Sequence, residues 1–169
     1  MMKHLHLSVL ALLLLGGTAS AQEVKVLGTY GKWIAHTYKE NGQAVCFMSV
    51  KPDSSEGNYK ARGDALFMVT LRPSEQAFDT ISVVAGYQYL PDSDAVVYVN
   101  GKRFNLFTNG ERAWARDGAT DKAIVPLLIQ GKTVSVKGTS SRNNVTTDVF
   151  PLSGFTAAHK AISDGCKKP

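Results

Sequence analysis

From residue 24 onward, short stretches of alternating apolar and polar residues are separated by turn-forming residues, which is the pattern of antiparallel strands. The clearest example is a hairpin in which residues 95–99 and 102–107 flank Asn100-Gly101. An Asn-Gly pair accepts the positive φ angles of a type I′ turn. The two-residue period of the hairpin predicts one shared face, made by Val97, Val99, Phe104 and Leu106.

The same reasoning predicts further strands at residues 33–38, 44–50, 64–72, 80–85, 133–139 and 145–150. Residues 51–63, 86–94 and 108–119 are rich in glycine, proline and polar residues and are interpreted as loops. Asn41-Gly42 predicts a second tight turn. The apolar run in 64–72 is nearly continuous, so we expect this strand to be buried on both faces.

Two helices are predicted. The first runs from an N-cap at Thr120 to Gly131, and Pro126 is expected to kink or shorten it. The second spans residues 154–164, capped by Ser153 and stopped by Gly165, with an apolar face of Phe155, Ala158, Ala161 and Ile162. About eight short strands with two small helices favour one all-β domain over residues 22–169, an antiparallel, immunoglobulin-like β-sandwich.

The first 21 residues have the layout of a secretory signal peptide. Lys3 precedes an apolar stretch at residues 7–15, and Ala19-Ser20-Ala21 forms a cleavage site of small residues before Gln22. The alternative is a membrane anchor, but a span needs roughly 20 apolar residues. We therefore expect cleavage and no stable membrane anchor, which places the mature protein in the periplasm or outside the cell.

Charge and cysteine content narrow the classes further. The net charge of +5 falls to +4 without Lys3, and the basic residues are not clustered, so a nucleic-acid partner is not expected. The chain has two cysteines, Cys46 and Cys166, which in an exported protein predict a disulfide. Closing a loop of about 120 residues would contribute just under about 5 kcal/mol in the chain-entropy model. Two free thiols are the alternative.

No motif for a nucleophile, a phosphate-binding loop or a metal is present, so no catalytic, cofactor-binding or metal residues are predicted. His36 and His159 stand in a predicted strand and a predicted helix without such a motif. One stretch resembles a binding surface. Arg112, Trp114 and Arg116 lie in a predicted loop, where an aromatic ring between two guanidinium groups can stack against an anionic or sugar partner. The alternative places Trp114 in the core.

Three groups of residues together resemble a known family: Gly31-Lys32-Trp33, Cys46-Phe47-Met48, and Gly154-Phe155 with Ala158, Ile162 and Cys166. They are similar to the invasion-associated locus B family of exported alphaproteobacterial proteins. The resemblance implies a periplasmic or secreted β-sandwich without an established enzymatic activity, whose founding members are linked to host-cell invasion. Many members have another cysteine soon after Gly-x-Trp, where this chain has Ile34-Ala35-His36-Thr37, which indicates a divergent branch.

The first functional hypothesis is therefore a non-enzymatic exported protein that binds an envelope or host component. The second is a small periplasmic hydrolase whose site is assembled from distant residues such as His36 and Asp64. The third is an inhibitor of a lytic enzyme that acts through a rigid loop at 51–63 or 108–119. The sequence does not name the partner or the oligomeric state.

Overall fold

The structure is a computed structural model that describes residues 23–167. The predicted signal peptide, residues 1–21, therefore lies outside the described residues. The elements in chain order are β1 (Lys25–Tyr30), β2 (Trp33–Glu40), β3 (Gln43–Val50), β4 (Ser54–Gly57), β5 (Leu66–Arg72), a 3-10 turn η1 (Pro73–Glu75), β6 (Ala77–Val84), β7 (Asp94–Val99), β8 (Lys102–Asn109), β9 (Arg112–Trp114), α1 (Gly118–Gln130), β10 (Thr133–Thr139), β11 (Val145–Pro151) and α2 (Phe155–Gly165).

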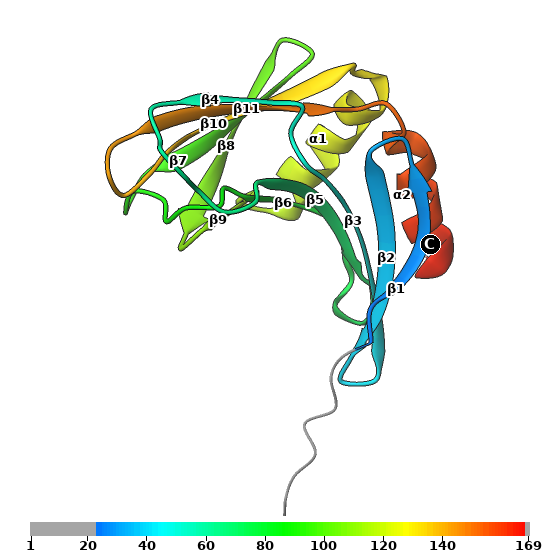
Figure 1. Ribbon diagram of the computed structural model, residues 1–169. Coiled ribbons are helices and arrows are strands. Elements are labelled where there is room, and N and C mark those ends of the chain that lie inside the picture. Colours follow the sequence, from blue (N-terminus) through cyan, green and yellow to red (C-terminus); the bar gives the residue numbers. More distant parts are fainter. Residues whose placement is uncertain (1–22, 168–169) are drawn as a thin grey trace, which may run out of the picture.

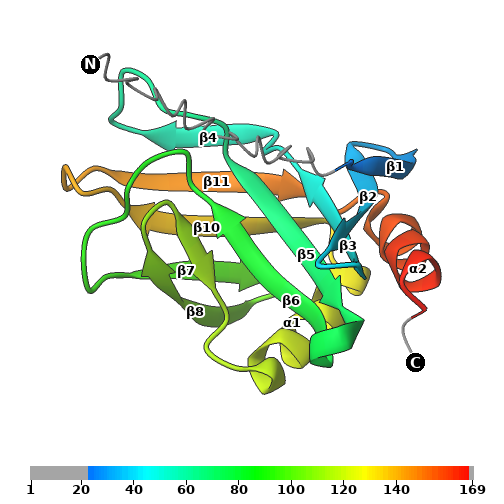
Figure 2. The ribbon, with the colours of Figure 1, turned by 90° about the horizontal axis from the view of Figure 1, so that it is seen from below.

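The strands form one antiparallel sheet of eleven strands in the order β1-β2-β3-β5-β6-β9-β8-β7-β10-β11-β4. The sheet bends over itself into two layers (Figures 1 and 2). Phe67 of β5 packs on Phe150 of β11 across the layers, with ring centroids 5.6 Å apart. The predicted antiparallel β architecture is confirmed, and its two layers are halves of a single sheet because short β9 pairs with both β6 and β8.

The core is organised around Trp33, which is fully buried. Its ring meets Phe67 and Phe155 edge-on, with centroids at 6.4 Å and 5.1 Å. Its indole N–H donates to the backbone oxygen of Pro151 at 2.9 Å, so the polar end of the ring is satisfied inside the core. Trp33 thereby links β2, β5, β11 and α2.

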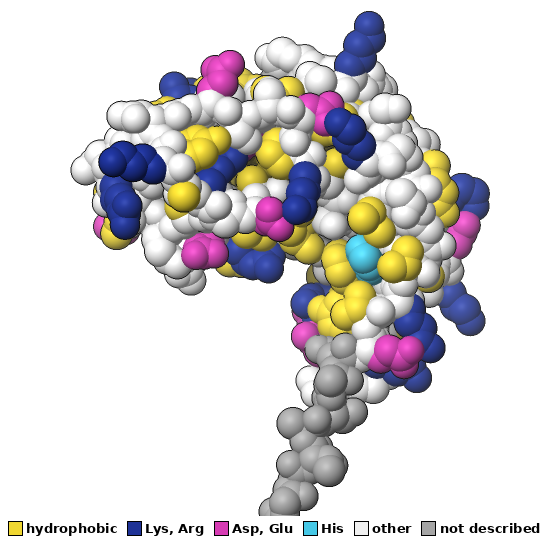
Figure 3. All heavy atoms as spheres, viewed as in Figure 1, with side chains coloured by type: hydrophobic (Ala, Val, Ile, Leu, Met, Phe, Trp, Pro, Cys, Tyr) yellow, Lys and Arg dark blue, Asp and Glu magenta, His cyan; other side chains and the backbone are white. Residues whose placement is uncertain are grey.

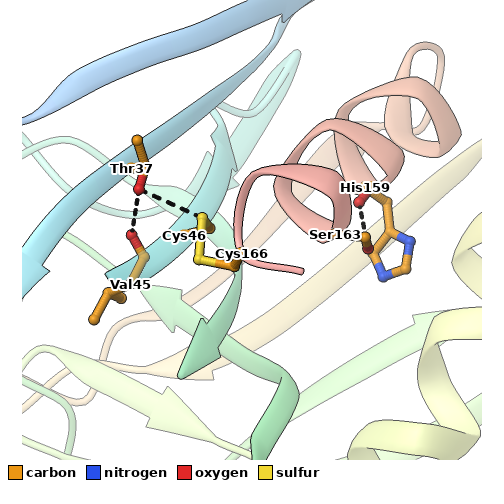
Figure 4. Close-up of a disulfide and its surroundings, with 6 residues drawn as sticks. All are labelled: Thr37, Val45, Cys46, His159, Ser163 and Cys166. Atoms are coloured by element: carbon orange, nitrogen blue, oxygen red, sulfur yellow. Dashed lines mark hydrogen bonds between the residues drawn. A yellow bond between two sulfur atoms is a disulfide. The ribbon is translucent and has the colours of Figure 1, made fainter. Parts of the chain in front are cut away.

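Helix α2 packs against β1, β2 and β3, while α1 packs against β6 and β7 (Figure 1). As predicted, Phe155, Ala158 and Ile162 of α2 are buried. The disulfide is also confirmed: Cys46 of β3 is bonded to Cys166, just beyond α2 (Figure 4). Within residues 23–167, neither helix has the length and apolar character needed to cross a bilayer.

Two predicted loops contain strands. The segment 51–63 includes β4, which pairs with β11, and 108–119 includes β9. The predicted burial of residues 64–72 on both faces is wrong. In β5 the burial alternates, with Phe67, Val69 and Leu71 in the core and Met68 and Thr70 half-buried on the other face.

The helix ends also differ from prediction. The N-cap of α1 is Asp117, whose carboxylate accepts from the backbone N–H of Thr120 at 2.7 Å, and the helix continues through Pro126 to Gln130. Helix α2 has no side-chain cap from Ser153. Instead, Gly154 is the N-cap with a φ of 91°, and a Cβ there would lie 2.0 Å from the backbone oxygen of Tyr30. This close approach requires glycine.

Candidate binding surface

The face of β2, β3, β5, β6 and β9 that points away from the core is not covered by either helix (Figure 2). Cross-strand pairing determines which side chains it presents. One row runs across the sheet in the paired order Ile34, Ser49, Met68, Ser82, Trp114 and Phe107. A second row contains Val26, His36, Phe47, Thr70 and Thr80.

Aromatic rings cover the β2–β3 part of this face. His36 stacks on Phe47 with centroids 4.7 Å apart, and Tyr38 meets the same phenylalanine edge-on at 6.0 Å. In Figure 3, hydrophobic side chains gather around a histidine on this part of the surface. Ile34 and Val26 are 37% and 62% exposed, so the apolar surface is open to a partner.

A groove of about 630 Å³ crosses this face, and we call it the concave groove. In Figure 3 the molecule is hollowed between the two arms of the bent sheet. Its lining combines aromatic, thioether and basic side chains: Val24, Tyr38, Phe47, Met68, Thr70, Arg72, Glu75, Ala77, Thr80, Ser82, Arg112 and Trp114. The volume lies in the range of small-molecule pockets.

The two arginines of the concave groove differ in their partners. Arg72 pairs with Glu40 and lies 4.0 Å from Glu75. Burial alone would lower the pKa of Arg72, but the hydrogen bond to Glu40 raises it overall. The Arg112 guanidinium donates a hydrogen bond to the sulfur of Met68 at 3.8 Å, and within the described chain it has no carboxylate partner. Its guanidinium is therefore available to an external anion.

His36 contributes a neutral ring. Burial lowers its pKa below the ordinary value of 6.5, and its Nδ1 is buried without a hydrogen-bond partner among the described residues. At neutral pH the imidazole therefore stacks as an uncharged aromatic group. The nitrogen without a partner costs free energy, because it has lost its hydration without gaining a hydrogen bond.

The structure brings together two of the three residues predicted for partner binding. Arg112 and Trp114 both line the concave groove, but they belong to strand β9 and not to a loop. Trp114 is half-buried and stacks on Phe107, so it is neither a core residue nor fully exposed. Arg116 lies beyond β9, is exposed, and pairs with Asp94 at 2.5 Å.

The sequence reasoning missed Tyr38, Phe47 and Met68 as groove residues. A signal was present, because β3 and β5 carry large apolar residues at both alternating positions, and for residues 64–72 we interpreted this pattern as burial on both faces. An apolar second face on a strand that is buried on one side is also typical of a binding surface.

A titratable cluster lies elsewhere, between α1, β6 and α2. His159 is hydrogen-bonded to Asp79 at 2.7 Å and stacks on Phe155, with centroids 5.9 Å apart. Asp121 accepts from the backbone N–H of Ile81 at 2.8 Å, and burial raises its pKa to about 6. The hydroxyl of Ser163 donates to the backbone oxygen of His159 and not to its ring (Figure 4).

The pair suggested for the hydrolase hypothesis is not assembled. Asp64 accepts from the ammonium group of Lys51 at 2.9 Å, while the Nδ1 of His36 has no partner among the described residues. The linings of the concave groove and of a second cleft, described below, do not include His159. Whether the protein is an enzyme is not tested by these linings. The expectation that it is not an enzyme stays a prediction.

The comparisons with known proteins agree with this fold. The crystal structure of invasion associated protein B from Bartonella henselae superposes with a TM-score of 0.59 at 19% identity, covering 88% of this chain and 99% of that one. No curated protein matches the sequence. The model of the invasion associated locus B (IalB) protein family matches residues 33–163. The chain therefore belongs to the invasion associated locus B family.

Proposed function

We propose that this protein is a non-enzymatic exported binding protein that captures a partner protein through the concave groove. The single observation that carries the proposal is the combination of an aromatic surface with Arg112, a guanidinium that has no carboxylate partner in the described chain. Such a surface favours an extended segment of the partner in which a large apolar side chain stands next to Asp or Glu. The mature net charge of +4, expected once Lys3 is removed, acts in the same direction.

In this proposal the aromatic residues and Arg112 have different energetic roles. The rings of Phe47, Tyr38 and Trp114 provide apolar area for an anchor side chain, and such anchors dominate binding free energy. Arg112 provides orientation, because a guanidinium pairs with a carboxylate through two parallel hydrogen bonds. The partner is an envelope or host protein, and the name of the family supports a link with invasion.

The segment 108–119, one of the two loops suggested for an inhibitor, is not a loop throughout. Residues 112–114 pair with β6 and β8, and Asp117 caps α1, so most of the segment 108–119 belongs to regular elements. Within residues 23–167, no specific contact favours the hydrolase or the inhibitor over the binding protein.

A peptide-display library tests the proposed chemistry. The mature chain should select peptides in which an acidic residue neighbours Phe, Leu or Trp. Against a synthetic peptide of that kind, Arg112→Gln should weaken binding about fivefold, which corresponds to roughly 1 kcal/mol. The matched control is Lys102→Gln, an exposed cation at the start of β8 outside the groove, which should leave Kd unchanged. Selection of basic peptides, or equal effects of the two variants, would contradict the proposal.

Photo-crosslinking identifies the partner in place. A benzophenone amino acid at Thr70, in the lining of the groove, should crosslink a specific protein, and the same group at Lys102 should not. Crosslinking in intact bacteria and at infected host cells separates an envelope partner from a host partner. The adduct should diminish with Arg112→Gln. An adduct that persists in this variant would show that the captured protein does not use the groove as proposed.

Export has its own test. The mature chain should begin at Gln22 and be found in the periplasm or the medium. Ala21→Pro should block cleavage and leave an unprocessed chain in the membrane fraction. N-terminal sequencing and cell fractionation measure both. A full-length chain that retains residues 1–21 in the cytoplasm would contradict the export part of the proposal without affecting the groove.

A further inference from the structure

A second cleft, of about 580 Å³, lies at the end of the molecule opposite α2. We call it the end cleft. The loop that follows β4 forms one wall and the β10–β11 turn forms another (Figures 1 and 2). Its lining consists of Asn58, Tyr59, Lys60, Ala61, Arg62, Tyr87, Gln88, Ser140, Ser141, Arg142, Asn144 and Thr146.

Buried interactions hold the walls of the end cleft in place. Arg62 and Asp148 form an ion pair whose side chains are 8% and 5% exposed. The Arg62 guanidinium also donates to the hydroxyl of Ser55 at 2.8 Å and lies over the ring of Tyr59, 4.8 Å from its centroid. The loop after β4 is thereby fixed to β11. Preorganised walls reduce the entropy that a ligand must remove on binding.

The floor is equally constrained. The hydroxyl groups of Tyr87 and Thr146 are 2.7 Å apart and hydrogen-bonded. Tyr87 and Tyr89 pack edge-on with centroids 5.3 Å apart, over Gly138. A Cβ at Gly138 would lie 2.7 Å from the Tyr89 ring and 2.8 Å from the Tyr87 hydroxyl, so glycine permits this packing. Burial raises the pKa of both phenols, which therefore stay protonated.

The β10–β11 turn is also ordered by its own hydrogen bonds. The Ser140 hydroxyl accepts from the backbone N–H groups of Arg142 and Asn144, at 3.3 Å and 3.2 Å. The backbone N–H of Ser141 donates to the backbone oxygen of Gln88 at 2.8 Å. Arg142 therefore projects from a defined turn.

The charged side chains that line the end cleft are all basic among the described residues. Lys60, Arg62 and Arg142 are cations, and no Asp or Glu is part of the lining. Arg62 is neutralised by Asp148, but Lys60 and Arg142 are exposed and have no acidic partner within the described residues. They come from different walls, the loop after β4 and the β10–β11 turn. Asn58, Gln88 and Asn144 add amide donors and acceptors beside the tyrosines.

From this arrangement we infer that the end cleft binds an anionic saccharide. A sugar ring packs on Tyr59 or Tyr87, its hydroxyl groups bond to the amide side chains, and its carboxylate or phosphate lies between Lys60 and Arg142. Aromatic faces suit the C–H face of a pyranose, while amides and hydroxyls satisfy its polar edge. The concave groove has a different lining and shares no residue with this site.

Titration of the mature chain by isothermal calorimetry or NMR tests the inference with named probes. Glucose 6-phosphate and 3′-sialyllactose present a phosphate and a carboxylate on a sugar, and their neutral counterparts are glucose and lactose. At least one anionic probe should bind at least tenfold more tightly than its neutral counterpart and than inorganic phosphate. Tighter binding of glucose 6-phosphate would indicate a phosphate ligand, and tighter binding of 3′-sialyllactose would indicate a carboxylate ligand. Binding of inorganic phosphate as tight as that of the sugar phosphate would overturn the saccharide part.

A charge-matched pair of variants locates the site. Lys60→Gln/Arg142→Gln removes two exposed cations from the end cleft and should weaken the anionic probe at least tenfold. Lys102→Gln/Arg103→Gln removes two exposed cations from the β7–β8 hairpin and should leave binding unchanged. Equal weakening by both double variants, or no binding of either anionic probe to the wild-type chain, would overturn the inference. Thermal unfolding of each variant confirms that it is folded.

Discussion

The ring of Trp114 lies on the ring of Phe107, with centroids 5.5 Å apart and planes inclined by 25°. The two residues are cross-strand partners of β9 and β8, so the stack follows from the register of the sheet. Through Ser82 on its other side, Trp114 also continues the row that reaches Met68. The tryptophan thus belongs to the sheet surface, where its ring packs on a neighbouring strand and also lines the concave groove.

Trp114→Ala should therefore have an intermediate effect. We expect a loss of about 1–3 kcal/mol in the free energy of unfolding, less than the 3–5 kcal/mol typical of a fully buried ring. Urea denaturation measures it, and capture of an acidic-apolar peptide should be lost as well. Tyr98→Ala is the control, because Tyr98 is 41% exposed, does not line the groove and should leave capture unchanged. No change in stability, or a loss above about 4 kcal/mol, would contradict this position of the ring.

Much of the fold could be predicted because turn chemistry and alternation are local. At both Asn-Gly turns the φ angles are positive, 50° and 79° at Asn41 and Gly42, and 48° and 72° at Asn100 and Gly101. In the hairpin, the four residues predicted to share one face pack toward the core: Val97, Val99 and Leu106 are buried, and Phe104 is half-buried against them.

The missed elements lack such local signals. Strand β4, Ser54–Gly57, is exposed throughout and carries no apolar alternation, and β9 has only three residues. Both form strands because partners distant in the sequence pair with them. Of the concave groove, only Arg112 and Trp114 were predicted, although large apolar residues on both faces of β3 and β5 were a local signal for Phe47 and Met68. The end cleft joins three distant segments, so nothing local in the sequence indicates it.

The disulfide should contribute strongly to stability. Cys166→Ser should lower the free energy of unfolding by about 2–5 kcal/mol, because the bond joins β3 to α2 across 120 residues. Differential scanning calorimetry with and without reductant measures the effect. The unfolded wild-type chain should show no titratable thiol. Cys46→Ala/Cys166→Ala is the control, since it lacks both the bond and a free thiol and should match the reduced protein. Two thiols in protein prepared under oxidising conditions would contradict the bond.

The ion pair beneath the end cleft should show strong coupling. Arg62→Met alone leaves the Asp148 carboxylate buried without its partner and should cost about 3–5 kcal/mol. The double variant Arg62→Met/Asp148→Leu removes both charges and should recover a large part of that loss. A double-mutant cycle from urea denaturation provides the coupling energy. Additive losses would show that the two side chains act independently.

Asp121 should make stability depend on pH. Burial raises its folded-state pKa from 3.8 to about 6, so its neutral form is favoured in the folded protein. The stability associated with that form is present below about pH 3.8 and is lost as the pH rises through about 6. The groups that face it are Asp79, which is hydrogen-bonded to His159, and Asp117.

Asp121→Asn should therefore raise the free energy of unfolding above pH 6 by about 1–3 kcal/mol, and the gain should vanish near pH 4. The acceptor for the Ile81 backbone N–H is retained in asparagine. Asp117→Asn is the contrasting variant: hydrogen bonding from Thr120 lowers the Asp117 pKa, so this substitution should reduce stability at neutral pH. Chemical denaturation from pH 4 to 8 measures both. A gain for Asp121→Asn that is largest at pH 4 would contradict the assignment.

The strand order leaves β1 and β4 as the two ends of the sheet in the described part of the chain. Free backbone edges are the usual route by which β-proteins add a foreign strand or aggregate. Here β1 is irregular between Val26 and Gly28, and α2 packs against it. At the other end, β4 is four residues long, polar, and carries Glu56. Both ends are poor templates for a fibril, so an aromatic groove can be displayed at high protein concentration without the sheet itself propagating from molecule to molecule.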